Sequence, residues 1–175
     1  MTREEFEDVL KRYETDVYSF CIRLCEKRED ADELFQDTWL DIIENMHKIE
    51  YSNNPKSYIM GRAFYIWKSK RRKIFRRKSI VPVSDMGEEF EKSIRDDKNL
   101  TPEENALKND EAEYLKYEIS RLKDRYRVVI EMFYSLDMSS KEISKSLHIP
   151  QGTVESRLHK ARKILKQRLE ENGYE

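Results

Sequence analysis

A run of cationic and aromatic side chains from Ser57 to Ile80 holds the clearest binding chemistry in this sequence of 175 residues. It reads SYIMGRAFYIWKSKRRKIFRRKSI, and no Asp or Glu occurs between Glu50 and Asp85. Lys and Arg attract phosphate groups whatever the base sequence, and exposed aromatic rings can stack on unpaired bases. The run therefore favours a surface for single-stranded nucleic acid, and a solvated basic helix face is the alternative.

The net charge of −1 hides four blocks of alternating sign. Residues 1–50 hold seven Lys/Arg against fifteen Asp/Glu, and residues 51–84 hold ten against none. Residues 85–113 hold four against eleven, and residues 114–175 hold thirteen against nine. This order of acidic, basic, acidic and basic blocks predicts separate surfaces for separate partners.

Residues 138–169, MSSKEISKSLHIPQGTVESRLHKARKILKQRL, predict two helices joined by a tight turn. Ser139 and Glu142 have the spacing of a capping box, so the first helix begins there. It ends at Leu147, and the second helix begins at Gln151. The apolar residues that would pack between the two helices are Ile143, Leu147, Val154, Leu158, Ala161 and Leu165. This pattern indicates a helix-turn-helix, whose second helix enters the major groove of DNA.

The opposite face of the second helix is polar and consists of Glu155, Ser156, His159, Lys160 and Lys163. Because short and long polar side chains can meet base edges, we assign base contacts to Ser156, His159 and Lys160. Phosphate contacts are assigned to Arg157, Arg162, Lys163 and the backbone amides of Gly152 and Thr153. An ordinary helical hairpin with a basic solvated face is the alternative to this interpretation.

Hydrophobic periodicity predicts an all-α protein with two small domains. The expected helices cover about 3–26, 31–46, 56–78, 102–122, 124–135, 140–147 and 151–171. From Ser79 to Glu104 the periodicity is lost and acidic residues dominate, which is typical of a flexible linker. We therefore predict domains at 1–78 and 105–175, the second a helix-turn-helix, joined by an acidic linker at 79–104.

Motifs at both ends of the chain resemble the extracytoplasmic-function (ECF) sigma factors. The string EISKSLHIPQGTVESRLHKARKIL (142–165) is similar to region 4 of that family, which binds the promoter −35 element. The string DADELFQDTWLDI (30–42) resembles the region 2.2 helix, which docks on the clamp helices of RNA polymerase. The resemblance implies that the polymerase contacts are Asp32, Glu33, Leu34, Gln36 and Asp37. A solvated helix face explains these acidic residues equally well without the resemblance.

The same resemblance places regions 2.3 and 2.4, which melt and read the −10 element, on the run from Ser57 to Ile80. The turn 51–55 lies where family members capture a flipped-out base. The implied −10 contacts are Ser52, Asn53, Asn54, Arg62, Tyr65, Trp67, Lys68, Lys70, Arg71 and Arg72. Trp67 is expected to face DNA, although about half of the aromatic rings in the run should be buried. Asn, Ile and Asp are frequent in the family where this chain has Tyr65, Arg62 and Ser69, so the preferred −10 bases are left open.

The resemblance implies a promoter-specificity subunit of RNA polymerase that acts in a bacterial cytoplasm. Its expected partners are core RNA polymerase, promoter DNA and an anti-sigma factor. A DNA-binding repressor or activator would explain the helix-turn-helix equally well but would leave the basic and aromatic run unexplained. Binding of the run to an anionic membrane is a weaker interpretation than binding to nucleic acid, because the aromatic residues of the run do not form an amphipathic stripe.

Catalysis is not expected. His47, His148 and His159 are isolated from any recognisable nucleophile or carboxylate arrangement, and no metal-ligand cluster or phosphate-binding glycine loop occurs, so we expect no cofactor and no metal. Cys21 and Cys25 are expected to be two buried thiols in a reducing compartment. Membrane insertion is not expected either, since no apolar run approaches the roughly eighteen residues of a spanning helix.

Overall fold

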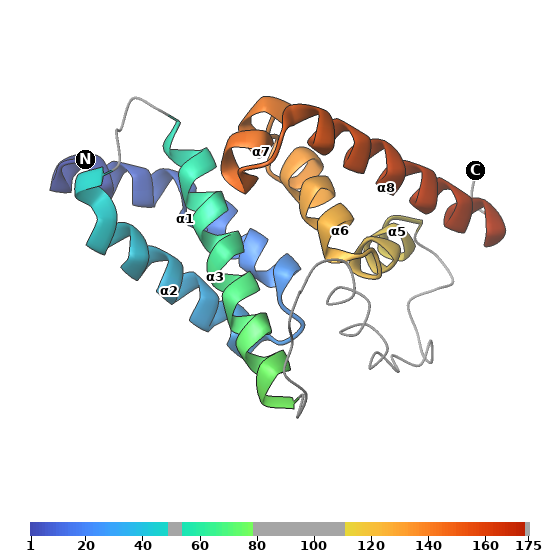
Figure 1. Cartoon of the computed structure of the whole chain (residues 1–175), viewed down its shortest axis with the longest axis horizontal. Helices are drawn as coiled ribbons and strands as arrows, with labels where there is room; N and C mark the ends of the chain where they lie inside the picture. The colour runs from blue at the N-terminus through green and yellow to red at the C-terminus, as the bar shows by residue number, and fades with distance from the viewer. Residues whose placement is uncertain (49–53, 79–110, 174–175) are drawn as a thin grey trace.

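The computed structural model describes residues 1–48, 54–78 and 111–173, and these residues form helices and turns without a strand. Helices α1 to α3 gather at one end and α5 to α8 at the other, with α3 and α7 side by side between them (Figure 1). The elements are α1 (Arg3–Leu24), α2 (Arg28–Asn45), η1 (Met46–Lys48), α3 (Pro55–Lys78), α5 (Glu111–Ser120), α6 (Asp124–Ile130), η2 (Glu131–Ser135), α7 (Ser140–Leu147) and α8 (Gln151–Glu171). The predicted all-α class with a C-terminal helix-turn-helix is confirmed, and the predicted linker lies outside the described residues.

Two helices begin with a capping box. At α1, the Thr2 hydroxyl accepts a hydrogen bond from the Glu5 amide at 3.2 Å, and the Glu5 carboxylate accepts one from the Thr2 amide at 2.7 Å. Ser139 and Glu142 form the same pair of bonds at the start of α7, at 3.3 and 2.8 Å. The box predicted at Ser139 is therefore confirmed, and it satisfies amides that the first helical turn leaves without intrahelical partners.

Helices α1 and α5 each end two residues before the predicted ends at 26 and 122, and the predicted start of α5 at 102 lies outside the described residues. Two further elements differ from the predicted helices. The second helix begins at Arg28, three residues before its predicted start. Two acidic residues in its first turn stabilise this earlier start, because negative side chains interact favourably with the positive end of the helix dipole. The predicted helix 124–135 divides into α6 and the π-helical turn η2. In that turn the Leu136 amide donates to the Glu131 carbonyl, five residues back, at 3.2 Å.

Buried side chains form one continuous core that runs through both ends of the molecule. In the N-terminal helices, Phe35 meets Tyr18 and Trp39 edge to face, which joins α1 to α2. In the C-terminal helices, the predicted apolar face of α8 is buried against α6 and α7. The two sets of helices thus share a core and pack as one body in this structure.

Small residues bring the backbones of α3 and α7 into direct contact. The Ser146 hydroxyl of α7 donates a hydrogen bond to the Ser57 carbonyl of α3 at 2.7 Å. One turn further along α3, a Cβ atom at Gly61 would lie 2.5 Å from the Ser146 carbonyl oxygen, closer than real Cβ atoms come. Glycine is therefore required at position 61 for this close approach of two helices.

Polar contacts extend this junction on either side. The Lys56 ammonium donates to the Leu136 carbonyl at 2.6 Å, and the Asn54 amide group donates to the Glu142 carboxylate. The hydrogen bonds that Ser139 and Asn54 donate to Glu142 hold the pKa of that carboxyl below its ordinary value. The bonds of Lys56 to Leu136 and of Asn54 to Glu142 thus link the N-terminal helices to the chain around the start of α7.

We predict that Gly61→Ala lowers the free energy of unfolding by about 1–3 kcal/mol, because the added methyl group forces α3 and α7 apart. Thermal unfolding measures the loss, and small-angle X-ray scattering should show a larger radius of gyration. Gly152→Ala is the matched control, because a Cβ there meets no atom within 4 Å and alanine favours a helix by up to about 1 kcal/mol. Equal stability of the two variants would contradict this account of the junction.

Candidate nucleic-acid interface

The second helix of the helix-turn-helix, α8, presents an exposed polar face. Ser156, His159, Lys160 and Lys163 are all exposed on it, and we call these four residues the reading face. The predicted core residues lie on the opposite side of the helix and are buried. Short and long hydrogen-bonding side chains on one helix face suit the donor and acceptor pattern of a major groove.

A small hydrogen-bond network fixes the start of α8 on α7. The Gln151 side-chain amide donates to the Glu155 carboxylate at 2.9 Å and to the Ser140 hydroxyl at 3.4 Å. The Ser140 hydroxyl also donates to Glu155 at 3.4 Å. Glu155, which we predicted on the DNA-facing surface, therefore ties the two helices together at the edge of that surface. Gly152 is exposed and Thr153 half-buried in the same first turn.

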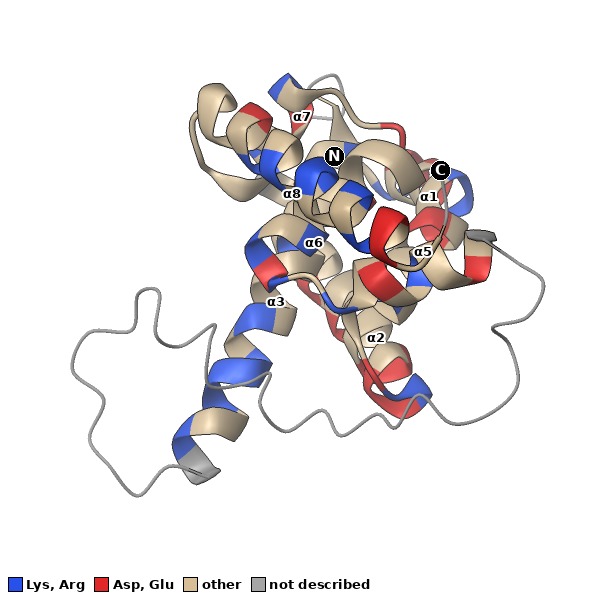
Figure 2. Cartoon of the chain, turned by 90° about the vertical axis from the view of Figure 1, so that its right-hand side faces the viewer, with Lys and Arg blue, Asp and Glu red and all other residues tan. Residues whose placement is uncertain are grey.

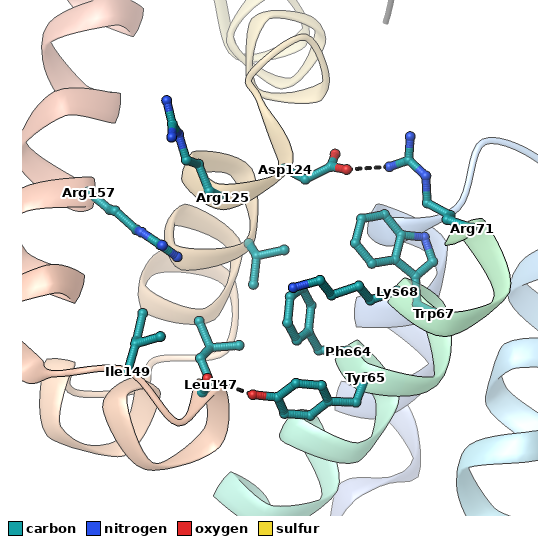
Figure 3. Close-up of a pocket in the computed structure, with 11 residues that line it drawn as sticks. Phe64, Tyr65, Trp67, Lys68, Arg71, Asp124, Arg125, Leu147, Ile149 and Arg157 are labelled. Carbon is teal, nitrogen blue, oxygen red and sulfur yellow. Dashed lines mark hydrogen bonds and ion pairs between the residues drawn. The ribbon is translucent and has the colours of Figure 1, made fainter. Parts of the chain in front are cut away.

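The predicted phosphate-binding residues of α8 lie in three different settings. Lys163 belongs to the reading face. Arg162 is exposed beside Tyr134, to whose hydroxyl its Nε donates at 2.7 Å. Arg157 is half-buried and lines a cavity of about 140 Å³ between α8 and α3 (Figure 3). In this arrangement of the helices Arg157 points into the space between the N-terminal helices (α1 to α3) and the C-terminal helices (α5 to α8) rather than outward.

Four of the residues predicted to contact the −10 element instead contact the C-terminal helices. Tyr65 donates its hydroxyl to the Leu147 carbonyl at 2.7 Å, and Arg71 pairs with Asp124 at 2.6 Å (Figure 3). Asn54 is bound to α7 as described above. Trp67 is only 5% exposed, so it is covered in this arrangement of the helices, and its contact with DNA stays a prediction.

Trp67 is buried because two arginines cover it. The guanidinium groups of Arg71 and Arg127 lie 4.8 and 5.6 Å from its ring centroid, and both pair with Asp124. Arg127 also donates to the Leu24 carbonyl of α1 at 3.3 Å, and its burial lowers its pKa from the ordinary value. An aromatic ring from α3 and a guanidinium from α6 thus form a cation–π contact across the junction.

Two other basic residues of the predicted −10 set pair with α2. Arg62 donates to the Asp41 carboxylate at 2.6 Å, a bond that raises the pKa of the guanidinium. Lys70 pairs with Glu33 at 2.9 Å and with Asp37. Lys68 and Arg72 are exposed, whereas Ser52 and Asn53 lie outside the described residues. The aromatic rings of α3 are mostly half-buried, and Trp67 is its one fully buried ring among the described residues.

Helix α2 carries the predicted polymerase contacts, and one of them is wrong. Leu34 is 1% exposed and belongs to the core between α1, α2 and α3, so it is not available to a partner. Leu40, six residues later, is 56% exposed and stands on the outer face instead. Glu33 and Gln36 are exposed, whereas Asp32 is half-buried and accepts a hydrogen bond from Tyr18 at 2.8 Å. The outer face of α2 is thus acidic with an exposed leucine.

Charge is segregated by helix. Lys and Arg follow α3 and α8, and Asp and Glu gather on α2 and α5 (Figure 2). The far end of α3 projects away from the body as a mostly basic stretch (Figure 2). Basic and acidic residues are thus concentrated on different helices, although Arg62 and Lys70 of α3 pair with acids of α2. Most of the acidic block 85–113 lies outside the described residues, so separate surfaces for separate partners stay a prediction.

The two cysteine thiols are poor nucleophiles, because their raised pKa values leave little thiolate near neutral pH. Burial raises the pKa of the Cys21 thiol to about 12, and burial together with Asp30 raises that of Cys25 to about 11. Cys21 is fully buried as expected, and Cys25 is half-buried. Over residues 1–48, 54–78 and 111–173 no cluster of three metal-ligating side chains occurs, and none of the helices there could span a bilayer.

Comparison with known proteins decides the family. Residues 9–74 match the family described as Sigma-70 region 2, and residues 112–165 match the one described as Sigma-70, region 4. The chain belongs to the sigma-70 family. The ECF RNA polymerase sigma factor SigW of Bacillus subtilis is 23% identical over 171 residues, which cover 95% of this chain and 90% of SigW. SigX of the same organism is 21% identical over 95% of this chain and 84% of its own length.

These near full-length matches make the chain an ECF-type RNA polymerase sigma factor, as the resemblance implied. Its fold is similar to that of the sigma factor RpoE from Bartonella quintana, solved in complex with the anti-sigma factor NepR. The identity is 20% and the TM-score 0.72, over 95% of this chain and 98% of RpoE.

Sequence reasoning missed two features of this sigma factor. The exposure of Leu40 does not follow from the sequence, because the packing of α1 and α3 decides which side of α2 is covered. Tyr134 was not assigned any role, although it is 59% exposed and holds Arg162. The two residues are 28 positions apart in the chain, so no local pattern signals their contact.

Proposed function

We propose that this sigma factor reads the −35 element with α8 and melts the −10 element with α3 after core RNA polymerase docks on α2. The observation that carries the proposal is the exposed reading face of α8, supported from behind by a buried apolar face. In this scheme residues 1–78 and 105–175 are the two working domains and residues 79–104 link them. The protein acts on promoter DNA in the bacterial cytoplasm, where polymerase is found.

The −10 role of α3 requires a change in the arrangement of the helices. Tyr65, Trp67 and Arg71 all contact the C-terminal helices, so a single strand cannot reach them until α7 and α6 move away. The reading face and the outer face of α2 are accessible without that change. Polymerase docking is therefore the step that can occur first and can separate the two halves.

An anti-sigma factor is the third partner that we propose. RpoE of Bartonella quintana was solved with the anti-sigma factor NepR, and CnrH was solved with the cytosolic domain of CnrY. This chain shares the fold of both proteins over more than 90% of its length. A partner that holds α3 against α7 would keep the proposed −10 residues covered.

Substitution of Ser156, His159 and Lys160 by alanine should change which −35 sequences this sigma factor prefers. Removing a base contact costs about 1–3 kcal/mol, so the ranking of promoter variants should flatten or reorder. The measurement is in vitro transcription with core polymerase from a set of −35 variants. Lys166→Ala, an exposed change further along α8, is the control and should preserve the ranking. An unchanged ranking in the triple variant would refute the assignment of α8.

Charge reversal at Glu33 and Asp37 should abolish binding to core polymerase while the helices stay folded. These carboxylates also pair with Lys70, so Lys70→Ala is the matched control that removes the internal pairing alone. A pull-down with core polymerase and circular dichroism should show a folded Glu33→Lys/Asp37→Lys variant that fails to bind, and a Lys70→Ala variant that binds. Failure of both variants to bind would assign the effect to the α2–α3 pairing, and normal binding by both would remove α2 as the docking surface.

A further inference from the structure

The exposed ring of Tyr134 has no role in the functions described so far. It lies in the π-helical turn η2, directly before α7, and is 59% exposed. Its neighbour Phe133 meets it edge to face, with 5.0 Å between ring centroids. A π-helical turn at this point is itself uncommon, and such turns occur frequently at functional sites.

These two rings form a corner that holds Arg162 of α8. The guanidinium carbon of Arg162 lies 5.5 Å from both ring centroids. Its Nε donates to the Tyr134 hydroxyl at 2.7 Å, and this bond does not use the two terminal nitrogens. Within the described part of the chain no carboxylate pairs with Arg162, so an external anion is its natural partner.

The corner stands on one particular side of α8. Glu155 and Arg162 are seven residues apart, two turns of the helix, so they share a side. Glu155 is bonded to Ser140, the first residue of α7, so this side faces the start of α7. In a helix-turn-helix the first helix crosses the DNA backbone while the second lies in the groove. A phosphate backbone that passes the start of α7 therefore runs beside Arg162.

We infer that Tyr134 is a positioning residue that holds Arg162 for a phosphate at the edge of the −35 element. The inference rests on the proposed function, because it takes α8 to lie in the major groove. The rings keep the planar guanidinium in place before DNA arrives, so less side-chain freedom is lost on binding than for an unsupported arginine. Because a phosphate carries no base identity, this contact adds affinity without changing the preferred sequence.

The test uses the holoenzyme on a promoter duplex over a series of salt concentrations. Arg162→Ala should weaken binding about fivefold for every −35 variant and lower the salt slope by about one. Tyr134→Ala should act in the same direction and somewhat less strongly, and Tyr134→Phe should fall between it and the wild type because it keeps the ring. In the Arg162→Ala background, Tyr134→Ala should have no further effect, since Tyr134 acts through Arg162.

Tyr117→Ala is the matched control. Arg121 lies 5.5 Å from the Tyr117 ring, the same distance, but Tyr117 is on α5 and Arg121 directly follows that helix, which is tied to the far end of α8 by the Glu118–Arg168 ion pair. That variant should bind promoters like the wild type. Thermal unfolding of Tyr134→Ala should match the wild type too, because a structural role would change the melting temperature and not the salt slope.

Any of three results for the Tyr134→Ala variant would overturn the inference. Tyr134→Ala could match Tyr117→Ala in affinity and salt slope, could weaken binding equally with and without Arg162, or could change the −35 ranking. If the wild-type holoenzyme itself showed no dependence on the −35 sequence, the proposed role of α8 would fail and this inference with it. If the wild type depended on the −35 sequence and Tyr134→Ala matched it in affinity and salt slope, only this inference would be overturned and the proposed role of α8 would stand.

Discussion

The contact of Gly61 with the Ser146 carbonyl determines how the whole molecule is arranged. It lets α3 and α7 touch backbone to backbone, and the two sets of helices then share one core. Any larger residue at position 61 would hold the helices apart, because a backbone oxygen cannot move aside as a flexible side chain can. The hydrogen bond from Ser146 to Ser57 and the pairing of Arg71 with Asp124 both depend on that close approach.

The three proposed binding surfaces differ in how accessible they are in this arrangement. The reading face of α8 and the outer face of α2 are accessible, whereas Tyr65, Trp67 and Arg71 of α3 are engaged by the C-terminal helices. The residues proposed to handle single-stranded DNA are thus the ones withheld from it. Because the proposed stacking rings Tyr65 and Trp67 contact the C-terminal helices, we expect the free protein to bind single strands weakly without polymerase.

Features that depend on local spacing could be predicted from the sequence, and features that depend on distant partners could not. The capping box at Ser139 and the buried face of α8 follow from residues close together in the chain. The burial of Trp67 depends on Arg127, sixty residues away, and no local pattern joins them. Leu34 and Leu40 are both apolar positions of one amphipathic helix, and only the packing of α1 and α3 decides that the first is core and the second is surface. The domain boundaries and the −10 contacts stay predictions.

The most direct test is to lock the junction of α3 and α7. Cysteines at positions 54 and 142, whose native side chains are hydrogen bonded, can be joined by a short cleavable cross-linker. We predict that the locked protein still binds core polymerase, through the accessible face of α2, but leaves the thymines of the −10 element unreactive to permanganate. Cleavage of the linker should restore reactivity in the same sample. A locked protein that melts the promoter as fast as the cleaved one would contradict the claim that α3 must leave α7 before DNA opens.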